Sequence, residues 1–367
     1  MKTLSVKFKK EAPGDFYHVL RQRVNQYFED KGLKKKATLY FKVKALSFIV
    51  AYFLLYFNLL FNVESKQGVF LSYMGMGLFM FLIFLNVVHD AAHEAIFKSR
   101  KLNLIFTWFL ELFGTNNRLW RTRHLDSHHI YPNIFGWDVD IKQSPLVRIA
   151  DNSPFLSFHR FQHLYMPVVY FVYTLNWLIY RDFKDITEKR LGPKVNVRYP
   201  WYQVAGMILA KITYVLYILV VPVLLLPVSF WTIFLAFLLM HFTTSFVTIF
   251  ALVSSHVGEN AVFPQPDEEG RLPHTWAEHQ LITTADYAAD NPLVTFLLGG
   301  FNLHVVHHLF PNVSHVHYPA LTEILKETAA EFNIEYRSFS LGEALMSHWK
   351  LLRRNSFKEN MALLEEA

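Results

Sequence analysis

The chain has 367 residues, of which 52% are hydrophobic, 17% aromatic and only 18% charged. Soluble domains usually carry about 25% charged residues, so this composition favours a membrane protein. The chain has no cysteine, which excludes disulfides and thiolate-held metals, and its net charge of +6 is concentrated in residues 1–44 and 97–200. That distribution is the positive-inside pattern of membrane proteins, and we expect no nucleic-acid partner.

Four long apolar stretches predict membrane-spanning helices, because a span needs roughly 20 apolar residues to cross the hydrocarbon of a bilayer. They cover residues 45–63, 68–88, 204–226 and 230–252. Short connections join the first span to the second and the third to the fourth. The predicted fold class is therefore an all-α integral membrane protein with four transmembrane helices in two hairpins. Lys211 lies close enough to the end of the third span to extend toward the membrane surface.

The whole chain, 1–367, is predicted to form one multi-pass membrane domain with its active site on the cytoplasmic side. Its parts are a cytoplasmic N-terminal segment (1–44), the four spans (45–252) with a cytoplasmic insertion (89–203), and a cytoplasmic helical cap (253–367). The stretches 102–114 and 161–180 are also apolar, but the histidine clusters could not meet on one side if the second stretch alone, or both stretches, crossed the membrane. We predict that both lie at the membrane interface.

Eight histidines form three tight clusters that lie just beyond span ends. They are His89 and His93; His124, His128 and His129; and His304, His307 and His308. Histidines three or four residues apart share one face of a helix, so each cluster can present its imidazoles toward a common point. Zinc takes about four ligands and iron about six, so eight imidazoles indicate two metal ions.

His256 follows the fourth span on the same side as the clusters and is a candidate ninth ligand. Four acidic residues adjoin the clusters: Asp90, Asp126, Asp138 and Asp140. We predict that these carboxylates accept hydrogen bonds from imidazole N–H groups and do not bind the metals directly. We predict no catalytic side chain beyond the metal ligands.

These motifs resemble the membrane fatty acid desaturase and hydroxylase superfamily, whose mark is three histidine boxes. The surrounding residues are most similar to front-end and linoleoyl-CoA-type acyl desaturases. The segments that carry this likeness are Trp120–His124, Tyr131–Asn133, Gly136–Ile141, Thr283–Asp286, Gly299–Asn302 and His307–Pro311. The resemblance implies O₂-dependent introduction of a double bond into a fatty acyl lipid or acyl-CoA at two iron ions, which zinc can replace in purified protein. It also implies a separate electron donor of ferredoxin or cytochrome b5 type.

Two residues depart from the pattern of the family. His304 stands where front-end desaturases usually have Gln, as in methyl-end desaturases, which leaves the position of the new double bond open. Leu252 stands where stearoyl-CoA-type enzymes have an Asn that holds a water molecule. The substrate-binding residues are unknown from the sequence; the basic candidates for a lipid headgroup are Arg118, Arg121, Arg123, Arg160 and Lys184.

Three other functions are compatible with parts of the pattern. A hydroxylase or other oxidase of the same fold would share the histidine spacing. A membrane zinc hydrolase needs about three histidines and a water, which leaves the other clusters unexplained. A metal transporter or sensor would place ligands along a path within the spans, where only His241 lies.

Overall fold

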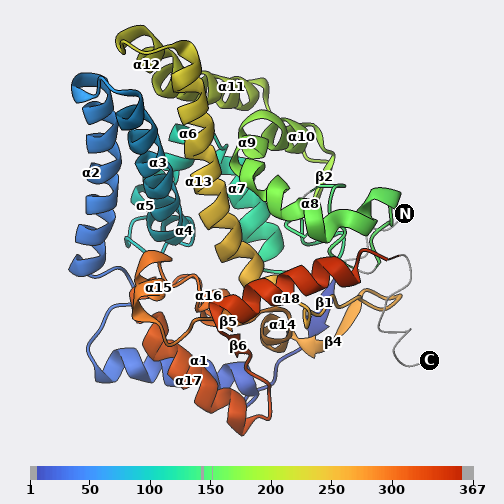
Figure 1. Cartoon of the computed structure of the whole chain (residues 1–367). Coiled ribbons are helices and arrows are strands. Elements are labelled where there is room, and N and C mark those ends of the chain that lie inside the picture. Colours follow the sequence, from blue (N-terminus) through green and yellow to red (C-terminus); the bar gives the residue numbers. More distant parts are fainter. Residues whose placement is uncertain (1–5, 142–143, 151, 358–367) are drawn as a thin grey trace.

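Four helical segments of the computed structural model, which describes residues 6–141, 144–150 and 152–357, are long and apolar enough to cross a membrane (Figure 1). They are Leu39–Asn62, Lys66–Ala92, Trp201–Leu225 and Phe230–His256. The prediction of four helices with the length and apolarity of membrane spans is therefore confirmed. The apolar stretches 102–114 and 161–180 form only short helices and turns, so neither adds a span among the described residues.

Two of the four spans contain a π-helical turn. The first span is α2 (Leu39–Asn62) and the fourth is α13 (Phe230–His256); the second joins α3 (Lys66–Ile83), η1 (Phe84–Val88) and α4 (His89–Ala92), and the third joins α11 (Trp201–Val215), η6 (Leu216–Val220) and α12 (Val221–Leu225). The side chains of Ser65 and Ser229 cap α3 and α13, because they accept hydrogen bonds from the N–H groups of Gly68 and Thr232 in the first turn of each helix. The turns before these two caps lie at one end of the long helices, opposite the end where α4 and α16 lie (Figure 1).

The spans α3 and α13 approach each other closely at Gly77. A Cβ atom there would lie 2.4 Å from the carbonyl oxygen of Met240, so only glycine fits without a shift. The Thr244 hydroxyl donates to the Gly77 carbonyl at 2.8 Å. Small residues and interhelical hydrogen bonds of this kind hold membrane helices together, because lipid gives apolar side chains little reason to associate. This contact fixes the two spans that carry His89 and His256.

The segment between the second and third spans folds into short elements along one side of the spans (Figure 1). They are α5 (Arg100–Thr107), α6 (Phe109–Leu112), α7 (Asn117–Arg123), η2 (His124–His128), η3 (Ser157–Phe161), α8 (Gln162–Val169), η4 (Tyr170–Val172), α9 (Tyr173–Asn176), η5 (Trp177–Arg181), α10 (Asp182–Thr187), β2 (Arg190–Leu191) and β3 (Lys194–Val195). The strands β2 and β3 pair antiparallel. The insertion therefore lines the space beside α3 and α13.

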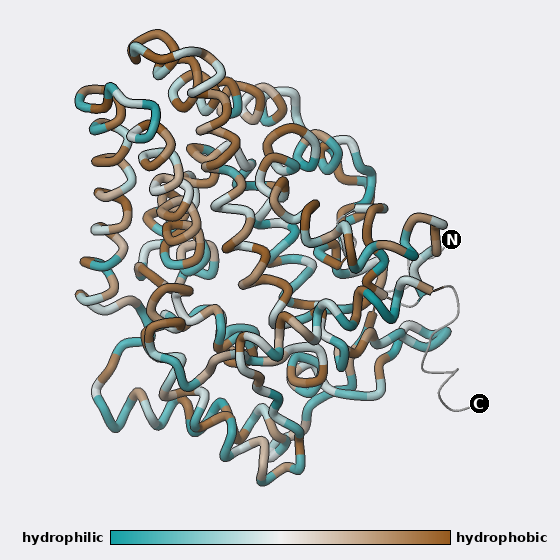
Figure 2. The backbone as a smooth tube through the Cα atoms, viewed as in Figure 1, coloured by the Kyte–Doolittle hydropathy of each residue, from teal (hydrophilic) through white to brown (hydrophobic). Residues whose placement is uncertain are grey.

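The remaining elements cover one end of the spans. They are β1 (Lys7–Lys9), α1 (Phe16–Asp30), β4 (Arg271–Thr275), α14 (Trp276–Thr283), β5 (Asp286–Tyr287), α15 (Pro292–Leu297), α16 (His304–Leu309), η7 (His315–His317), α17 (Tyr318–Glu331), β6 (Ser338–Phe339) and α18 (Leu341–Arg354). The strands form the parallel pairs β1–β4 and β5–β6. Figure 2 shows that the long helices are mostly hydrophobic, whereas this end is richer in hydrophilic residues. The histidine clusters lie where these two regions meet.

Lys211 is predicted from the sequence to extend toward the membrane surface; in the structure its side chain is buried against the insertion. Its Nζ lies 2.8 Å from Asp182 Oδ2, 2.8 Å from the Gly114 carbonyl and 3.1 Å from the Trp177 carbonyl, and the side chain is buried. The insertion packs on the third span and supplies a carboxylate and two carbonyls. The charge is therefore neutralised inside the fold, where three acceptors satisfy the ammonium group.

Glu111, in α6, gives the fold a pH dependence. Burial raises the pKa of its carboxyl to about 7, although the Asn117 N–H donates to Oε1 at 2.9 Å. The folded chain then binds this proton more tightly than the unfolded chain does, so stability falls as pH rises from the unfolded pKa toward about 7. Asp182 also raises this pKa, whereas Lys211 lowers it.

Glu111→Gln keeps the oxygen acceptor and removes the titration. We expect the Tm of the wild-type protein to fall more than that of Glu111→Gln when the pH is raised from about 5 to about 8. Thermal unfolding in detergent at several pH values measures this difference. Parallel curves for the two proteins would show that Glu111 has no raised pKa.

Candidate metal centre

All nine predicted histidines come together in two groups among the described residues. Group 1 contains His89, His93, His124, His129 and His307, and group 2 contains His128, His256, His304 and His308. In each group one nitrogen atom of every histidine lies within 4.8 Å of the others. His256, at the end of α13, thus stands with the third cluster. The arrangement gives five imidazoles to one point and four to another.

The second cluster is divided between the groups, because it forms the π-helical turn η2. The His129 N–H donates to the His124 carbonyl at 3.0 Å, five residues back. In an α-helix His128 would stand over His124, but the wider π turn places His129 there. The prediction that His124 and His128 share a face is therefore wrong. The π turn sends His124 and His129 to group 1 and His128 to group 2.

The other two clusters follow α-helical spacing. His89 and His93 are four residues apart and both join group 1. In α16, His304 and His308 are four residues apart and join group 2, whereas His307 points to group 1. The helix α16 therefore lies between the groups and serves both, although the sequence predicts a common point for all three of its histidines.

In each group the Nε2 atoms of several imidazoles lie close to one another. In group 1, Nε2 of His124 lies 3.0 Å from that of His93 and 3.2 Å from that of His129. In group 2, Nε2 of His308 lies 3.1 Å from that of His256 and 3.3 Å from that of His304. Nε2 of His89 is buried and makes no hydrogen bond to any described residue. Atoms placed in this way are suited to share a cation.

Burial keeps most of these imidazoles neutral, which is the form that binds metals. It lowers the pKa well below the usual value for His93, His124, His129, His304, His307 and His308. Burial also opposes charge on His128, but the Asp138 and Asp140 carboxylates outweigh it and raise the pKa of that ring. An all-imidazole donor set suits iron, copper or zinc and does not suit magnesium or calcium. The residues present therefore fit a pair of such ions.

Every imidazole of group 2, and His307 of group 1, has a hydrogen-bond partner on its other ring nitrogen. The Nδ1 partners are Asp138 Oδ2 for His128 (3.1 Å), the Thr283 carbonyl for His256 (3.1 Å), the Phe301 carbonyl for His304 (3.1 Å), Tyr318 Oη for His307 (3.1 Å) and Gln280 Oε1 for His308 (2.8 Å). An Nδ1–H that donates to oxygen leaves the Nε2 lone pair free for a metal. Sequence reasoning assigned no role to Gln280 or Tyr318.

Of the four predicted acidic partners, Asp138 is the one that the structure places against a ring of the two groups. Asp90 accepts from Ser314 and lies 3.1 Å from His315 Nδ1, which lies outside both groups. The Asp126 carboxylate is half exposed and pairs with Lys194. Asp140 pairs with Arg123 at 2.9 Å. Asp90 and Asp126 therefore meet other partners, whereas one carboxylate oxygen of Asp140 also lies within 4.8 Å of a ring nitrogen of His128.

Arg123 is also corrected as a headgroup candidate. Its side chain is only 1% exposed and binds two carboxylates, Asp140 and Asp185. Because it immediately precedes His124, this pairing fixes the start of η2 and so the direction of the second cluster. His241, inside the fourth span, is likewise used in packing: its ring nitrogens lie 2.9 Å from Thr174 Oγ1 and 2.8 Å from Tyr214 Oη. This arrangement favours a structural role for His241 over a place on a transport path.

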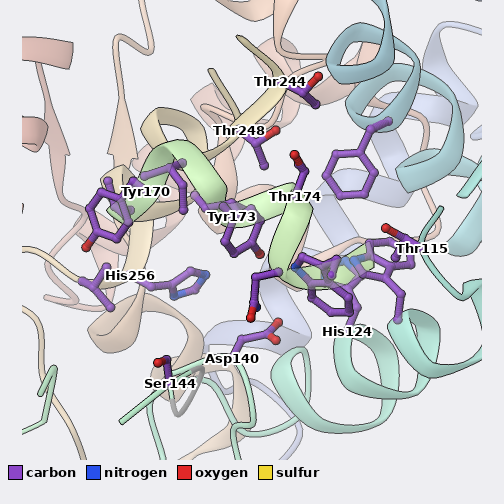
Figure 3. A pocket seen from close by; sticks show the side chains of 18 of the residues that line it. Thr115, His124, Asp140, Ser144, Tyr170, Tyr173, Thr174, Thr244, Thr248 and His256 are labelled. Carbon is purple, nitrogen blue, oxygen red and sulfur yellow. The ribbon is translucent and has the colours of Figure 1, made fainter. Parts of the chain in front are cut away.

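An apolar pocket of about 300 Å³ reaches both groups (Figure 3). Its wall includes His89, His124, His128, His256 and His304. Most of the lining is apolar or aromatic, for example Met80, Phe84, Phe113, Trp120, Met166 and Trp177. Pockets for small molecules span roughly 300–1,000 Å³, so this space can take an extended hydrocarbon chain. Leu252 also lines it, so an apolar side chain faces the pocket at that position.

Gln280 provides a test of the oxygen partners. We expect Gln280→Leu to weaken metal binding by about 10–100-fold, because His308 loses the acceptor that orients its ring. Competition with a chelator, followed by metal analysis, measures the affinity. Gln265→Leu is the matched control, since Gln265 is exposed and bonds only the Phe263 carbonyl. Equal metal affinities for the two variants would contradict this role of Gln280.

The fatty acid desaturase family model matches residues 66–340, a range that includes all three histidine clusters. The chain is 29% identical over 339 residues to an sn-1 linoleoyl-lipid 6-desaturase of Synechocystis sp., covering 92% of this chain and 94% of that protein. It is 28% identical to an acyl-lipid (8-3)-desaturase of Physcomitrium patens (94% of this chain, 72% of the relative) and 30% identical to one of Mortierella alpina (93% and 78%). The chain belongs to the fatty acid desaturase family and is an oxidoreductase of lipid metabolism.

Proposed function

We propose that this protein is an O₂-dependent acyl-lipid desaturase whose two histidine groups each hold one iron ion. The observation that carries the proposal is the apolar pocket, which touches histidines of both groups and has room for an acyl chain. The names of the relatives support an acyl-lipid substrate over acyl-CoA, and one of them names a linoleoyl lipid. Zinc can occupy the same donors in purified protein.

When bound, the iron pair supplies the strong oxidant that removal of hydrogen from an unactivated methylene pair requires. The overall reaction combines –CH₂–CH₂–, O₂, two electrons and two protons to give –CH=CH– and two water molecules. The electrons come from a one-electron carrier of ferredoxin or cytochrome b5 type. His89, His93, His124, His129 and His307 would hold one ion, and His128, His256, His304 and His308 the other.

The protein itself holds the chain and keeps the site dry. Trp120 stacks on His124 with ring centroids 4.8 Å apart, and Phe301 packs on His304 at 4.2 Å. Both aromatic residues line the pocket, so they separate the acyl chain from bulk water next to the imidazoles. The buried hydrogen bonds to Nδ1 fix the rings, and the rigid pocket wall fixes which methylene pair faces them.

We further propose that the four spans form two hairpins in the bilayer and that the histidine groups lie on its cytoplasmic side. Residues 1–44 carry 12 Lys and Arg against 4 Asp and Glu, which favours the cytoplasm for the end of the spans where they lie. The N-terminal segment, the insertion and the C-terminal cap would then belong to one domain on that side.

Expression in a host without polyunsaturated lipids tests the proposed function. We expect gas chromatography with mass spectrometry to show acyl chains with one additional double bond, at a position that the same analysis identifies. The His307→Ala variant should make no such product, since His307 belongs to group 1. Hydroxylated chains in place of unsaturated ones would identify a hydroxylase of the same fold, and an unchanged lipid profile would contradict both functions.

A further inference from the structure

A second, smaller cavity also reaches His256. Its volume is about 20 Å³, and Ser255, Thr284, Asn260 and Arg337 are among its lining residues. His256 lines both cavities and is therefore the partition between them. The proposed chemistry of the acyl pocket does not use this second space.

Two hydroxyl groups in this cavity have no hydrogen-bond partner. Ser255 is 5% exposed and Thr284 is 1% exposed, and neither Oγ atom bonds to any described residue. Their sequence neighbours differ: Ser254 Oγ donates to the Phe250 carbonyl at 2.7 Å, and Thr283 Oγ1 donates to the His279 carbonyl at 2.6 Å. A buried hydroxyl without a partner is costly, so a pair of them in one cavity indicates a polar ligand.

The cavity has the size and polarity of a water site. A water molecule needs about 10–15 Å³ of such space and two or more polar partners. The volume exceeds this requirement, and the two hydroxyls supply the partners. Of the residues that line the cavity, Ser255 and Thr284 are buried whereas Asn260 is exposed to solvent. The cavity therefore leads from His256 toward the protein surface.

We propose that this cavity holds ordered water and is the inner end of a route by which water passes between group 2 and the cytoplasm. The inference rests on the proposed function, in which each new double bond is accompanied by two water molecules, formed from O₂, the two hydrogens removed from the acyl chain, two electrons and two protons. The acyl chain fills the apolar pocket during the reaction. Water therefore needs a second, polar path, and the smaller cavity at His256 offers one.

Arg337 indicates that the route serves water and not protons. Its guanidinium lines the cavity and donates to the Asn260 carbonyl at 2.8 Å and to the Leu281 carbonyl at 3.2 Å. These carbonyls fix a positive charge beside the path. A fixed guanidinium repels hydronium while water passes, as in water-selective pores. The protons that the reaction consumes must then reach the site by a path other than this cavity.

The water site is tested by structure and by stability. An iron-loaded wild-type structure that resolves ordered water should show one molecule within hydrogen-bond distance of both Ser255 Oγ and Thr284 Oγ1. Thr284→Val should lower the Tm, because it removes a water-mediated hydrogen bond. In a dry cavity the same change removes an unsatisfied hydroxyl, so an unchanged or higher Tm would overturn the proposal.

The route is tested by kinetics of the purified protein with acyl lipid, O₂ and a one-electron carrier. The double variant Ser255→Ala/Thr284→Val should lower kcat several-fold, with KM, iron content and double-bond position unchanged. Thr243→Val is the matched control on α13; its hydroxyl bonds the Leu239 carbonyl and lines neither cavity. Equal kcat values for the two variants would overturn the route. An inactive wild-type protein would contradict the proposed function itself, whereas active protein with a dry cavity would contradict only this inference.

Discussion

His256→Ala protein is expected to bind one iron ion per chain in place of two and to form no double bond. His256 is one of four imidazoles in group 2, and its Nε2 lies 3.1 Å from that of His308. Three remaining ligands hold iron far more weakly than four, because each imidazole contributes a bond and the metal prefers a nearly complete donor set. Group 1 keeps its five histidines, so its ion should remain.

Metal analysis of purified protein measures this result. His163→Ala is the control, because His163 lies outside both groups and bonds Ser356 Oγ at 3.0 Å. It should retain two ions and full activity. Two tightly bound ions in His256→Ala would show that His256 is not a ligand and would reduce the donor set to the eight histidines of the three clusters.

Lys211→Met is expected to cost about 3–5 kcal/mol of stability, the usual effect of removing one partner of a buried ion pair. The substitution leaves Asp182 buried with its carboxylate unpaired, and the Gly114 and Trp177 carbonyls lose a donor. The insertion is joined to the third span at this point. If the insertion moved away from the third span, the acyl pocket would also widen, because Trp177 of the insertion lines that pocket.

Thermal or denaturant unfolding in detergent measures the change. Lys326→Met is the matched control, because Lys326 pairs with an exposed Glu323 and such surface pairs contribute about 1 kcal/mol or less. The double variant Lys211→Met/Asp182→Asn should recover part of the loss, since it removes the unpaired charge. Equal stabilities of Lys211→Met and Lys326→Met would contradict the buried pair.

The spans could be predicted from the sequence because the bilayer imposes a simple rule of length and apolarity. The three histidine clusters can meet only on one side of the membrane, so 102–114 and 161–180 were excluded as spans. The structure has no span in either stretch. His256 entered the predicted donor set because it follows the fourth span on the side of the clusters. These predictions depend only on composition and on the order of segments, both of which can be read from the amino-acid sequence.

The division of the histidines could not be predicted in the same way. Whether His128 or His129 stands over His124 depends on one i→i+5 hydrogen bond in η2. Spacing alone assumes an α-helix. The acceptors on Nδ1 were missed for a related reason: Gln280 is 28 residues from His308, so only the folded chain brings them together.

The acidic residues illustrate the limit of sequence proximity. Asp138, ten residues from His128, contacts its ring, whereas Asp126, two residues away, points to Lys194. In a helical turn neighbouring residues face different directions, so short spacing says little about contact. The resemblance to desaturases indicated the class of reaction. The structure shows which imidazoles lie together in each group.

The comparison of iron-loaded with zinc-loaded protein tests the central claim most directly. Both forms are purified, supplied with acyl lipid, O₂ and a one-electron carrier, and assayed for new double bonds. Zinc binds such nitrogen sites at least as tightly as Fe(II) but has no redox chemistry. We predict that the iron form desaturates the lipid and that the zinc form is folded and inactive. Full activity with zinc in the absence of iron would contradict the account.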